Sequence, residues 1–338
     1  MPEKFPYNLE QAQEEAKVIR AKLESGEAID YAEADKIVEI EKFRAESPYF
    51  DELLKNENEL EDGYEIIDTP TSRSGGYHFV METKSGRKFV EKYPEKNEDE
   101  DFKKNHETMD FINEYFESNL IKYAISIGIL DGNKFDVPSI KLDPEEDGAY
   151  FSEFFPNIIN GLKGGDVLNA MAVINNLPKE AIDKLPMDQY AHFKKQYSKY
   201  LDIFWKELTK KENAIPLALI HLVAGDFDRN MSNYGFQISK SADEIDFKIV
   251  ILDMAGGWGE NRQWKGRIGN VLLKNFSKDE IMQQWEKIKS YITEGIVEKI
   301  VKQIPFDDEL KSKKRDEVLN NIKNMEKLVE EELAAVEA

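Results

Sequence analysis

The chain has 338 residues, 41% of them hydrophobic, and a net charge of −21 that comes from 67 acidic residues against 46 Lys and Arg. The apolar fraction is enough for a packed core and excludes a chain that is disordered throughout. The excess of acidic residues excludes a general nucleic-acid-binding protein, because phosphate binding needs clustered cations. The chain has no cysteine, which excludes disulfides, thiol nucleophiles and Cys-ligated zinc.

The sequence contains no uninterrupted apolar run of about 18 residues, so we expect no transmembrane helix. The N-terminal stretch MPEKFPYNLEQAQEEAK lacks the basic start and apolar core of a secretory signal peptide. Both features predict a protein that works in a cytosol.

Residues 1–62 differ from the rest of the chain in charge, with 18 Asp or Glu against 8 Lys or Arg. Apolar residues recur there at helical spacing, for example at Ile37, Ile40 and Phe43. The pattern predicts an acidic, helical N-terminal extension over residues 1–62.

The next segment, residues 63–155, is predicted to form a small β-rich lobe around one long helix over residues 102–127. Strand-like runs lie on both sides of that helix and are separated by acidic or Gly-containing turns. The expected strands are 64–67, 77–83, 88–93, 136–142 and 149–156.

Residues 156–338 are predicted to form a larger helical lobe, interrupted by one hairpin of residues 234–239 with 247–253. The whole chain is therefore expected to be α+β, with a bilobal body that follows the helical extension. The expected helices of the larger lobe include 186–209, 215–223, 277–303 and 308–338.

Three polar residues around this hairpin carry the main functional signal. The loop VAGDFDRNMSNYGF contains Asp228 and Asn233, and the second strand of the hairpin ends at Asp253. The hairpin can bring the three residues together at one edge. Phosphoryl transfer from a nucleotide needs such a set, because one carboxylate accepts the proton of the attacking hydroxyl while an Asn oxygen and a second carboxylate hold Mg²⁺.

This part of the sequence resembles atypical protein-kinase-like enzymes. The string DRNMSNYGF is similar to the catalytic loop of HipA-type bacterial Ser/Thr kinases and of phosphoinositide kinases, and LDMAGGWG is similar to the metal-binding segment of Golgi casein kinases. The resemblance extends over residues 64–275 and implies a bilobal protein-kinase-like fold. It implies Asp228 as the catalytic aspartate, with Asn233 and Asp253 as the metal ligands.

The chain departs from the family pattern at three points. Asn230 stands where many relatives have His, Met254 takes the place of Phe in the Asp-Phe-Gly motif, and the first loop lacks a Gly-x-Gly-x-x-Gly string. Neither substituted position holds the metal. The missing glycine string bears on how the nucleotide is held.

The β-rich lobe offers candidates for ATP binding. A kinase needs a strand lysine for the α- and β-phosphates and a helix glutamate that holds this lysine. Lys92 is the preferred lysine, because Lys88 sits nearer the turn at the strand entrance. The long helix resembles the corresponding helix of HipA-type kinases, which implies Glu114 as the partner and leaves Glu107 and Glu117 as alternatives.

The loop TSRSGGYHF (71–79) would cover the phosphates in this scheme. Backbone amides beside Gly75 and Gly76 can approach phosphate oxygens closely, and Ser74 or Ser72 can donate from its hydroxyl. ATP with Mg²⁺, or with Mn²⁺ in its place, is therefore the expected ligand pair.

The leading prediction is an atypical Ser/Thr protein kinase that acts on a protein substrate. The resemblance would also suit a bacterial effector kinase that is delivered into a host cytosol and needs a host cofactor such as an inositol polyphosphate. Lys103, Lys104 and Lys122 on the long helix are candidates for binding that cofactor.

Two alternatives remain open at this stage. A phosphoinositide kinase is favoured by the basic residues of segment 256–275, namely Arg262, Lys265, Arg267 and Lys274. A nucleotidyl transferase or a pseudokinase on the same fold is the other alternative, because the sequence does not show how the nucleotide is oriented.

Three further features are interpreted as structural. His221 lies in an apolar run and is expected to be buried. Asp226 is expected to cap the turn before Asp228, with a second carboxylate of the site as the alternative. The basic run over residues 311–315 is expected to be a solvated helix face, with an anionic lipid or inositol phosphate contact as the alternative.

Overall fold

This structure is a computed structural model. It describes residues 64–68, 79–83, 86–92, 100–142, 150–153, 155, 158–161, 167–175, 177–178, 181, 184–240, 245–252, 254, 267–304, 306 and 308–337. The chain divides into two units, Met1–Asn56 and Glu57–Ala338, and every described residue belongs to the second. The predicted extension over residues 1–62 therefore lies outside the described residues.

The first sheet is antiparallel throughout and has the strand order β1-β2-β3-β6-β5. Phe89 on β3 and Phe151 on β6 are fully buried, so this sheet has an apolar core of its own. Its runs of aromatic and β-branched residues explain why these short segments become strands. The strands are β1 (Tyr64–Asp68), β2 (Phe79–Thr83), β3 (Lys88–Lys92), β5 (Ile140–Leu142) and β6 (Tyr150–Glu153).

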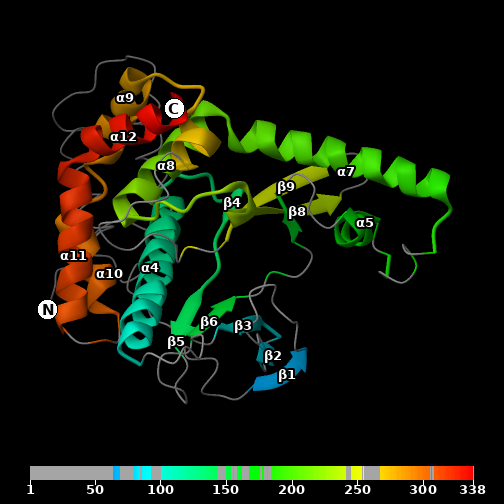
Figure 1. The fold of residues 1–338 in the computed structure, drawn as a ribbon, viewed down its shortest axis with the longest axis horizontal. Coiled ribbons are helices and arrows are strands. Elements are labelled where there is room, and N and C mark those ends of the chain that lie inside the picture. The colour runs from blue at the N-terminus through cyan, green and yellow to red at the C-terminus, as the bar shows by residue number, and fades with distance from the viewer. Residues whose placement is uncertain are drawn as a thin grey trace, which may run out of the picture. The chain divides into compact units, whose positions relative to one another are not determined.

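The long helix α4 (Glu100–Ser126) packs against one face of this sheet. The ring of Phe111 contacts the ring of Tyr150 on β6 with centroids 5.4 Å apart, and Ser118 Oγ donates to the Pro138 carbonyl oxygen at 2.5 Å. Residues 111–120 are all buried, because α4 also contacts α8 (Lys211–Ala224) and runs beside α10 (Glu294–Lys302) (Figure 1).

The second sheet has the order β4-β9-β8-β7. Its centre is the predicted hairpin, in which Tyr234 pairs with Ile251 and Lys240 with Ile245. β4 runs parallel to β9, whereas β7 runs antiparallel to β8. The strands are β4 (Phe135–Asp136), β7 (Ile159–Asn160), β8 (Tyr234–Lys240) and β9 (Ile245–Ile251).

The strand expected over residues 136–142 is wrong as a single element. Asp136 ends β4 in the second sheet, and Ile140 begins β5 in the first. Pro138 lies between them and has no N–H to donate to a strand ladder, so the chain changes sheets there. This short link joins the two sheets of the molecule.

Helices make up most of the chain after residue 160, which confirms the predicted α+β class with a small β-rich part before a larger helical part. The helices expected over 277–303 and 308–338 are each split in two, the first by Thr293, which caps a new helix. The helices beyond α4 and α8 are α5 (Val167–Asn175), α7 (Met187–Leu208), α9 (Lys278–Ile288), α10 (Glu294–Lys302), α11 (Asp308–Lys323) and α12 (Met325–Glu337).

The helix α8 is the centre of this helical part. Residues 213–224 are buried on every side, which fits a run that is apolar all round rather than amphipathic. α4, α7, α9, α11 and α12 all contact it. None of the described helices is long and apolar enough to cross a membrane.

A short π-helical segment, η2 (Gly269–Leu273), is held against α12 through Gly269. The Gly269 N–H donates to Glu332 Oε2 at 3.0 Å, and a Cβ at this glycine would run into the Glu332 carbonyl oxygen and the Val336 side chain. The absence of a side chain is therefore what allows η2 and α12 to approach so closely.

We predict that Gly269→Ala lowers the free energy of unfolding by about 1–3 kcal/mol, because the backbone of α12 must move to admit the methyl group. Chemical denaturation monitored by circular dichroism measures the change. The matched control is Gly295→Ala in α10, where the nearest atom to the new Cβ is 3.7 Å away. The control should be neutral or stabilising by about 0.5–1 kcal/mol. Equal stability of the two variants would contradict the predicted close contact.

Candidate functional site

The loop that carries Asp228 begins where α8 ends. Gly225 takes the left-handed conformation with φ +79°, and its N–H donates to the Leu222 carbonyl oxygen at 3.3 Å. The Asp226 N–H donates to the His221 carbonyl oxygen at 3.0 Å. This pair of bonds is the usual glycine-terminated helix end, and it turns the chain sharply into residues 226–230.

Two buried side chains hold this loop. Asp226 Oδ1 accepts the Asp228 N–H at 3.2 Å, which confirms Asp226 as the residue that caps the turn. Asp226 also forms an ion pair with Arg229, which has no exposed surface. Arg229 Nη1 donates in turn to the Leu252 carbonyl oxygen at 2.8 Å, so the loop is bonded to the end of β9.

The structure brings Asp228 and Asn233 together. Asn233 Nδ2 donates to the Asp228 carbonyl oxygen at 2.6 Å, and Asn233 Oδ1 accepts from Ser232 Oγ at 3.1 Å. The Asn230 side chain caps the short helix η1 (Met231–Asn233) by accepting the Ser232 N–H at 2.8 Å. The hydrogen bond from Asn233 Nδ2 to the Asp228 carbonyl thus fixes the orientation of the side-chain oxygen of Asn233.

The end of β9 is fixed against the same loop. The Leu252 N–H donates to the Asn233 carbonyl oxygen at 2.8 Å, which continues the pairing of Tyr234 with Ile251. Leu252 therefore bonds to the loop on both sides, through Asn233 and through Arg229. Asp253 follows Leu252 in the chain but lies outside the described residues.

The carboxylate of Asp228 is partly exposed, at 26% for its side chain, and it forms an ion pair with Arg267. Asn230 Nδ2 also lies 3.4 Å from Asp228 Oδ1. In the sequence, Arg267 is one of several basic residues in segment 256–275. That cluster of positive charge was the signal for it, but nothing in the sequence singles out the partner of Arg267.

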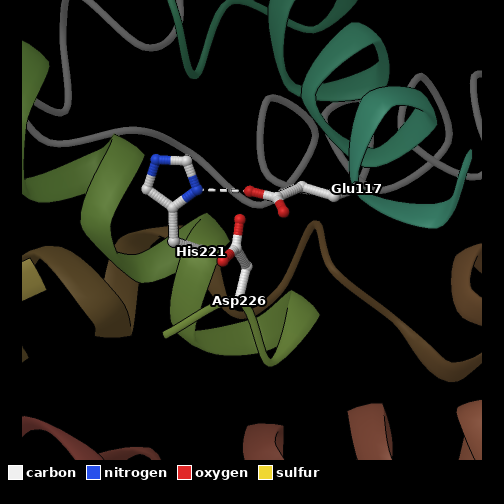
Figure 2. Close-up of side chains that lie close together, drawn as sticks. All are labelled: Glu117, His221 and Asp226. Carbon is white, nitrogen blue, oxygen red and sulfur yellow. Dashed lines mark hydrogen bonds and ion pairs between the residues drawn. The ribbon is translucent and has the colours of Figure 1, made fainter. Parts of the chain in front are cut away.

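A buried polar cluster lies directly behind the loop and joins it to α4. Figure 2 shows Glu117 from α4 converging on His221 and Asp226 from α8 and the following loop. His221 Nδ1 contacts Glu117 Oε1, and His221 Nε2 lies 3.1 Å from Tyr234 Oη. All four residues are buried, which confirms the buried structural role expected for His221.

The pKa values in this cluster follow from burial. Burial lowers the pKa of His221 well below its ordinary value of 6.5, so the imidazole is neutral. Burial also raises the pKa of Glu117, and raises that of Asp226 well above its ordinary value, although Arg229 opposes both shifts. The carboxyls of Glu117 and Asp226 thus both lie in surroundings that favour the protonated form, and the positive charge of Arg229 opposes this tendency.

Glu117, His221 and Asp226 could each offer a ligand atom to a metal ion, since these atoms all lie within 4.8 Å of one another. Arg229, however, already supplies a positive charge at this point through its ion pair with Asp226. The set is therefore better understood as a buried, charge-compensated cluster that positions the loop.

The structure distinguishes the three glutamates that were considered as partners of Lys92. Glu117 is engaged by His221, Glu114 is 1% exposed, and the side chain of Glu107 lies outside the described residues. The backbone of Lys92 pairs with Tyr150. Ser74, Gly75 and Gly76 lie outside the described residues.

The interpretation of residues 311–315 as a solvated face is wrong for Lys314. Its side chain is 1% exposed, and Nζ donates to the Ala224 carbonyl oxygen and to Asn113 Oδ1, each at 2.7 Å. The helical period places Lys314 on the same side of α11 as the buried Val318 and Asn321, which faces α8. Lys314 thus satisfies a carbonyl at the end of α8.

Lys122, considered as a ligand for an inositol polyphosphate, has a local partner in the structure. Its Nζ donates to Ser139 Oγ at 2.9 Å, and burial lowers its pKa to about 8. The side chains of Lys103 and Lys104 lie outside the described residues.

Comparisons with known proteins give distant similarities. No protein-family model matches the chain, and a search of curated proteins finds no match. Among solved structures, the chain is similar to the proinflammatory kinase CtkA of Helicobacter pylori, with 12% identity and a TM-score of 0.40, over 81% of this chain and 97% of that one. It is also similar to the Rio2 kinase–ADP/Mg²⁺–phosphoaspartate complex from Chaetomium thermophilum, with 10% identity and a TM-score of 0.34, over 97% of this chain and 95% of that one.

The buried His221 predicts a specific dependence of stability on pH. The unfolded imidazole binds a proton below about pH 6.5, whereas the folded one stays neutral, so acidification favours the unfolded chain. Relative to His221→Gln, the wild type should lose about 1.4 kcal/mol of unfolding free energy per pH unit below pH 6.5. Urea titrations of both proteins between pH 7 and pH 5 measure this difference.

Glu117 and Asp226 have raised pKa values in the folded state, so their contribution to the unfolding free energy is lost as pH rises. This pH dependence is opposite in sign to that of His221. Both carboxyls are present in the wild type and in the variant, and the difference between the two proteins isolates the imidazole. Parallel pH profiles for the two proteins would show that His221 is not held neutral.

Proposed function

We propose that the chain is an atypical Ser/Thr protein kinase that transfers the γ-phosphate of Mg-ATP to a protein hydroxyl. The observation that carries this proposal is the double bonding of Leu252, through Asn233 and Arg229, to the loop that holds Asp228. This bonding sets the residue before Asp253 against Asn233. Two oxygen ligands and one separate carboxylate are the groups that phosphoryl transfer needs.

Asp228 is proposed as the base. It follows a rigid helix end, its backbone N–H is held by Asp226, and its carboxylate is partly exposed to a substrate. In the proposed step the substrate hydroxyl oxygen attacks the γ-phosphorus, the bond from that phosphorus to the bridging oxygen breaks, and ADP leaves. The hydroxyl proton passes to the Asp228 carboxylate.

Asn233 and Asp253 are proposed as the metal ligands. An amide oxygen and a carboxylate are hard oxygen donors, which suit Mg²⁺ and also Mn²⁺. Asn233 fits this role because Nδ2 is bonded to the Asp228 carbonyl, which directs Oδ1 as the acceptor. When bound, Mg²⁺ would neutralise the phosphate oxygens of ATP.

Lys92 and Glu114 are proposed to hold the α- and β-phosphates. Lys92 lies on β3, whose neighbour β6 meets α4 through Tyr150, and Glu117 is engaged by His221, which favours Glu114 as the partner. The backbone around Ser74, Gly75 and Gly76 is proposed to cover the phosphates. The corresponding lobes are residues 63–155 and 156–338, after a helical extension over 1–62.

The direct test supplies the purified chain with Mg²⁺ and ATP labelled at the α- or the γ-phosphate, in the presence of a mixture of Ser- and Thr-containing proteins. A parallel reaction contains inositol hexakisphosphate, to test for an activator. We predict label on protein from the γ-position only. Asp228→Asn should lower turnover by about 10²–10⁴-fold with little change in ATP affinity, because it removes a proton acceptor. Asp253→Asn should abolish metal-dependent turnover.

The matched control is Asp202→Asn, which changes an exposed carboxylate on α7 and should leave turnover unchanged. Label from the α-position would identify nucleotidyl transfer, and label on phosphoinositides alone would identify a lipid kinase. Retained turnover in Asp253→Asn would contradict the assigned metal ligands.

Because Lys92 rather than Lys88 is proposed to bind the phosphates, alanine substitutions at these two positions of β3 should have different effects on ATP turnover. Lys92→Ala should lower kcat/KM for ATP by about 10²-fold, because a charged phosphate contact is lost in a partly desolvated site. Lys88→Ala, at the other end of β3, is the control and should stay within about threefold of wild type. Steady-state kinetics at varied ATP measure both. The reverse order would transfer the role to Lys88.

A further inference from the structure

A cavity of about 500 Å³ opens beside the loop that carries Asp228. Its wall comes from the end of α7, from the residues after Asp228 and from η2. Three of the described lining residues are cations, namely Lys206, Arg267 and Lys274. The proposed phosphoryl-transfer step makes no use of this cavity.

The cavity adjoins the proposed base directly. Arg267 lines the cavity and forms the ion pair with Asp228. Asn230 also lines it and places Nδ2 at 3.4 Å from Asp228 Oδ1. A group bound in the cavity therefore sits next to the position at which a substrate hydroxyl would give up its proton.

The charge of the wall is opposite to that of the chain. Acidic residues outnumber Lys and Arg by 67 to 46 overall, yet the described lining contains three cations and no Asp or Glu. Lys206 and Lys274 are exposed at this wall, so their charges can meet a ligand. Such local complementarity selects an anionic group and repels a cationic one.

The rest of the cavity wall is apolar or carries side-chain amides, and this limits the kinds of anion that the cavity can bind well. Trp205, Met231 and Val271 contribute apolar surface, and Trp205 is anchored by its Nε1, which donates to the Gly161 carbonyl oxygen at 2.8 Å. A free polyphosphate needs cations on several sides and gains little from apolar surface. A glutamate or aspartate side chain within a peptide offers one carboxylate together with methylene groups and backbone.

We propose that this cavity binds acidic side chains of the protein substrate, beside the hydroxyl that receives the phosphate. The inference rests on the proposed kinase function and adds the substrate class, a Ser or Thr flanked by Asp or Glu. Arg267 links the two sites, because a substrate carboxylate in the cavity competes with Asp228 for the same guanidinium.

Binding is tested with the full chain and two fluorescent peptides, one with a serine flanked by glutamates and one with lysines in their place. We expect the wild type to bind the glutamate peptide at least about tenfold more tightly, with weaker binding at higher salt. Lys206→Glu and Lys274→Glu should each weaken that binding on the order of tenfold. Lys302→Glu, an equal charge change on the exposed end of α10 and outside the cavity, should stay within about twofold.

The same peptides are then offered as substrates with labelled ATP, and thermal unfolding confirms that each variant is folded. A rise in KM for the glutamate peptide in Lys206→Glu and Lys274→Glu, with kcat little changed, is the expected result. Tight, variant-sensitive binding without labelling would support the cavity and contradict the kinase function.

Three results of the peptide-binding experiment would overturn the proposal. These are equal binding of the two peptides, equal binding by wild type and the cavity variants, and loss of affinity in Lys302→Glu to the same extent. Vesicles containing phosphatidylinositol phosphates form a further arm. Binding to them but not to the glutamate peptide, with loss in both cavity variants, would assign the cavity to a lipid headgroup instead.

Discussion

The arrangement of the candidate site depends on one buried guanidinium. Arg229 pairs with Asp226 at the start of the loop and donates to the Leu252 carbonyl at the end of β9. A cation without any exposed surface is costly unless it is paired and hydrogen bonded, so the chain must bring both partners to it. The fold therefore holds the loop against the hairpin. The two segments that carry Asp228 and Asp253 cannot separate without leaving the Arg229 guanidinium with an unsatisfied hydrogen bond.

The same charge extends the influence of the loop to the long helix α4. Asp226 and Glu117 share a buried environment with Arg229, and Glu117 also contacts His221. A helix fixed at Glu117 has its preceding turn fixed as well, and that turn carries Glu114. The polar cluster thus ties the position of the proposed phosphate-binding pair to the position of the proposed base, although these residues come from distant parts of the chain.

The sequence was informative where function depends on local spacing. The five-residue interval from Asp228 to Asn233 was sufficient to predict that these two residues lie close together, and the hairpin predicted that Asn233 lies beside the end of β9, where Leu252 bonds to it. Partners that depend on packing of distant helices were not predictable. Lys314 was mistaken for a surface residue because its run is basic, and only the contact of α11 with α8 buries it. The ion pair of Arg267 with Asp228 was likewise not predictable, because nothing in the spacing of these two residues along the sequence indicates it.

The last two helices take part in the candidate site without carrying any of its proposed catalytic groups. Lys314 on α11 satisfies the final carbonyl of α8, and α12 holds η2, which follows Arg267, through the close approach at Gly269. The order of synthesis therefore matters. A nascent chain exposes the loop, the hairpin and Arg267 before it possesses α11 and α12, so the contacts that fix them form only once these two helices have been synthesised.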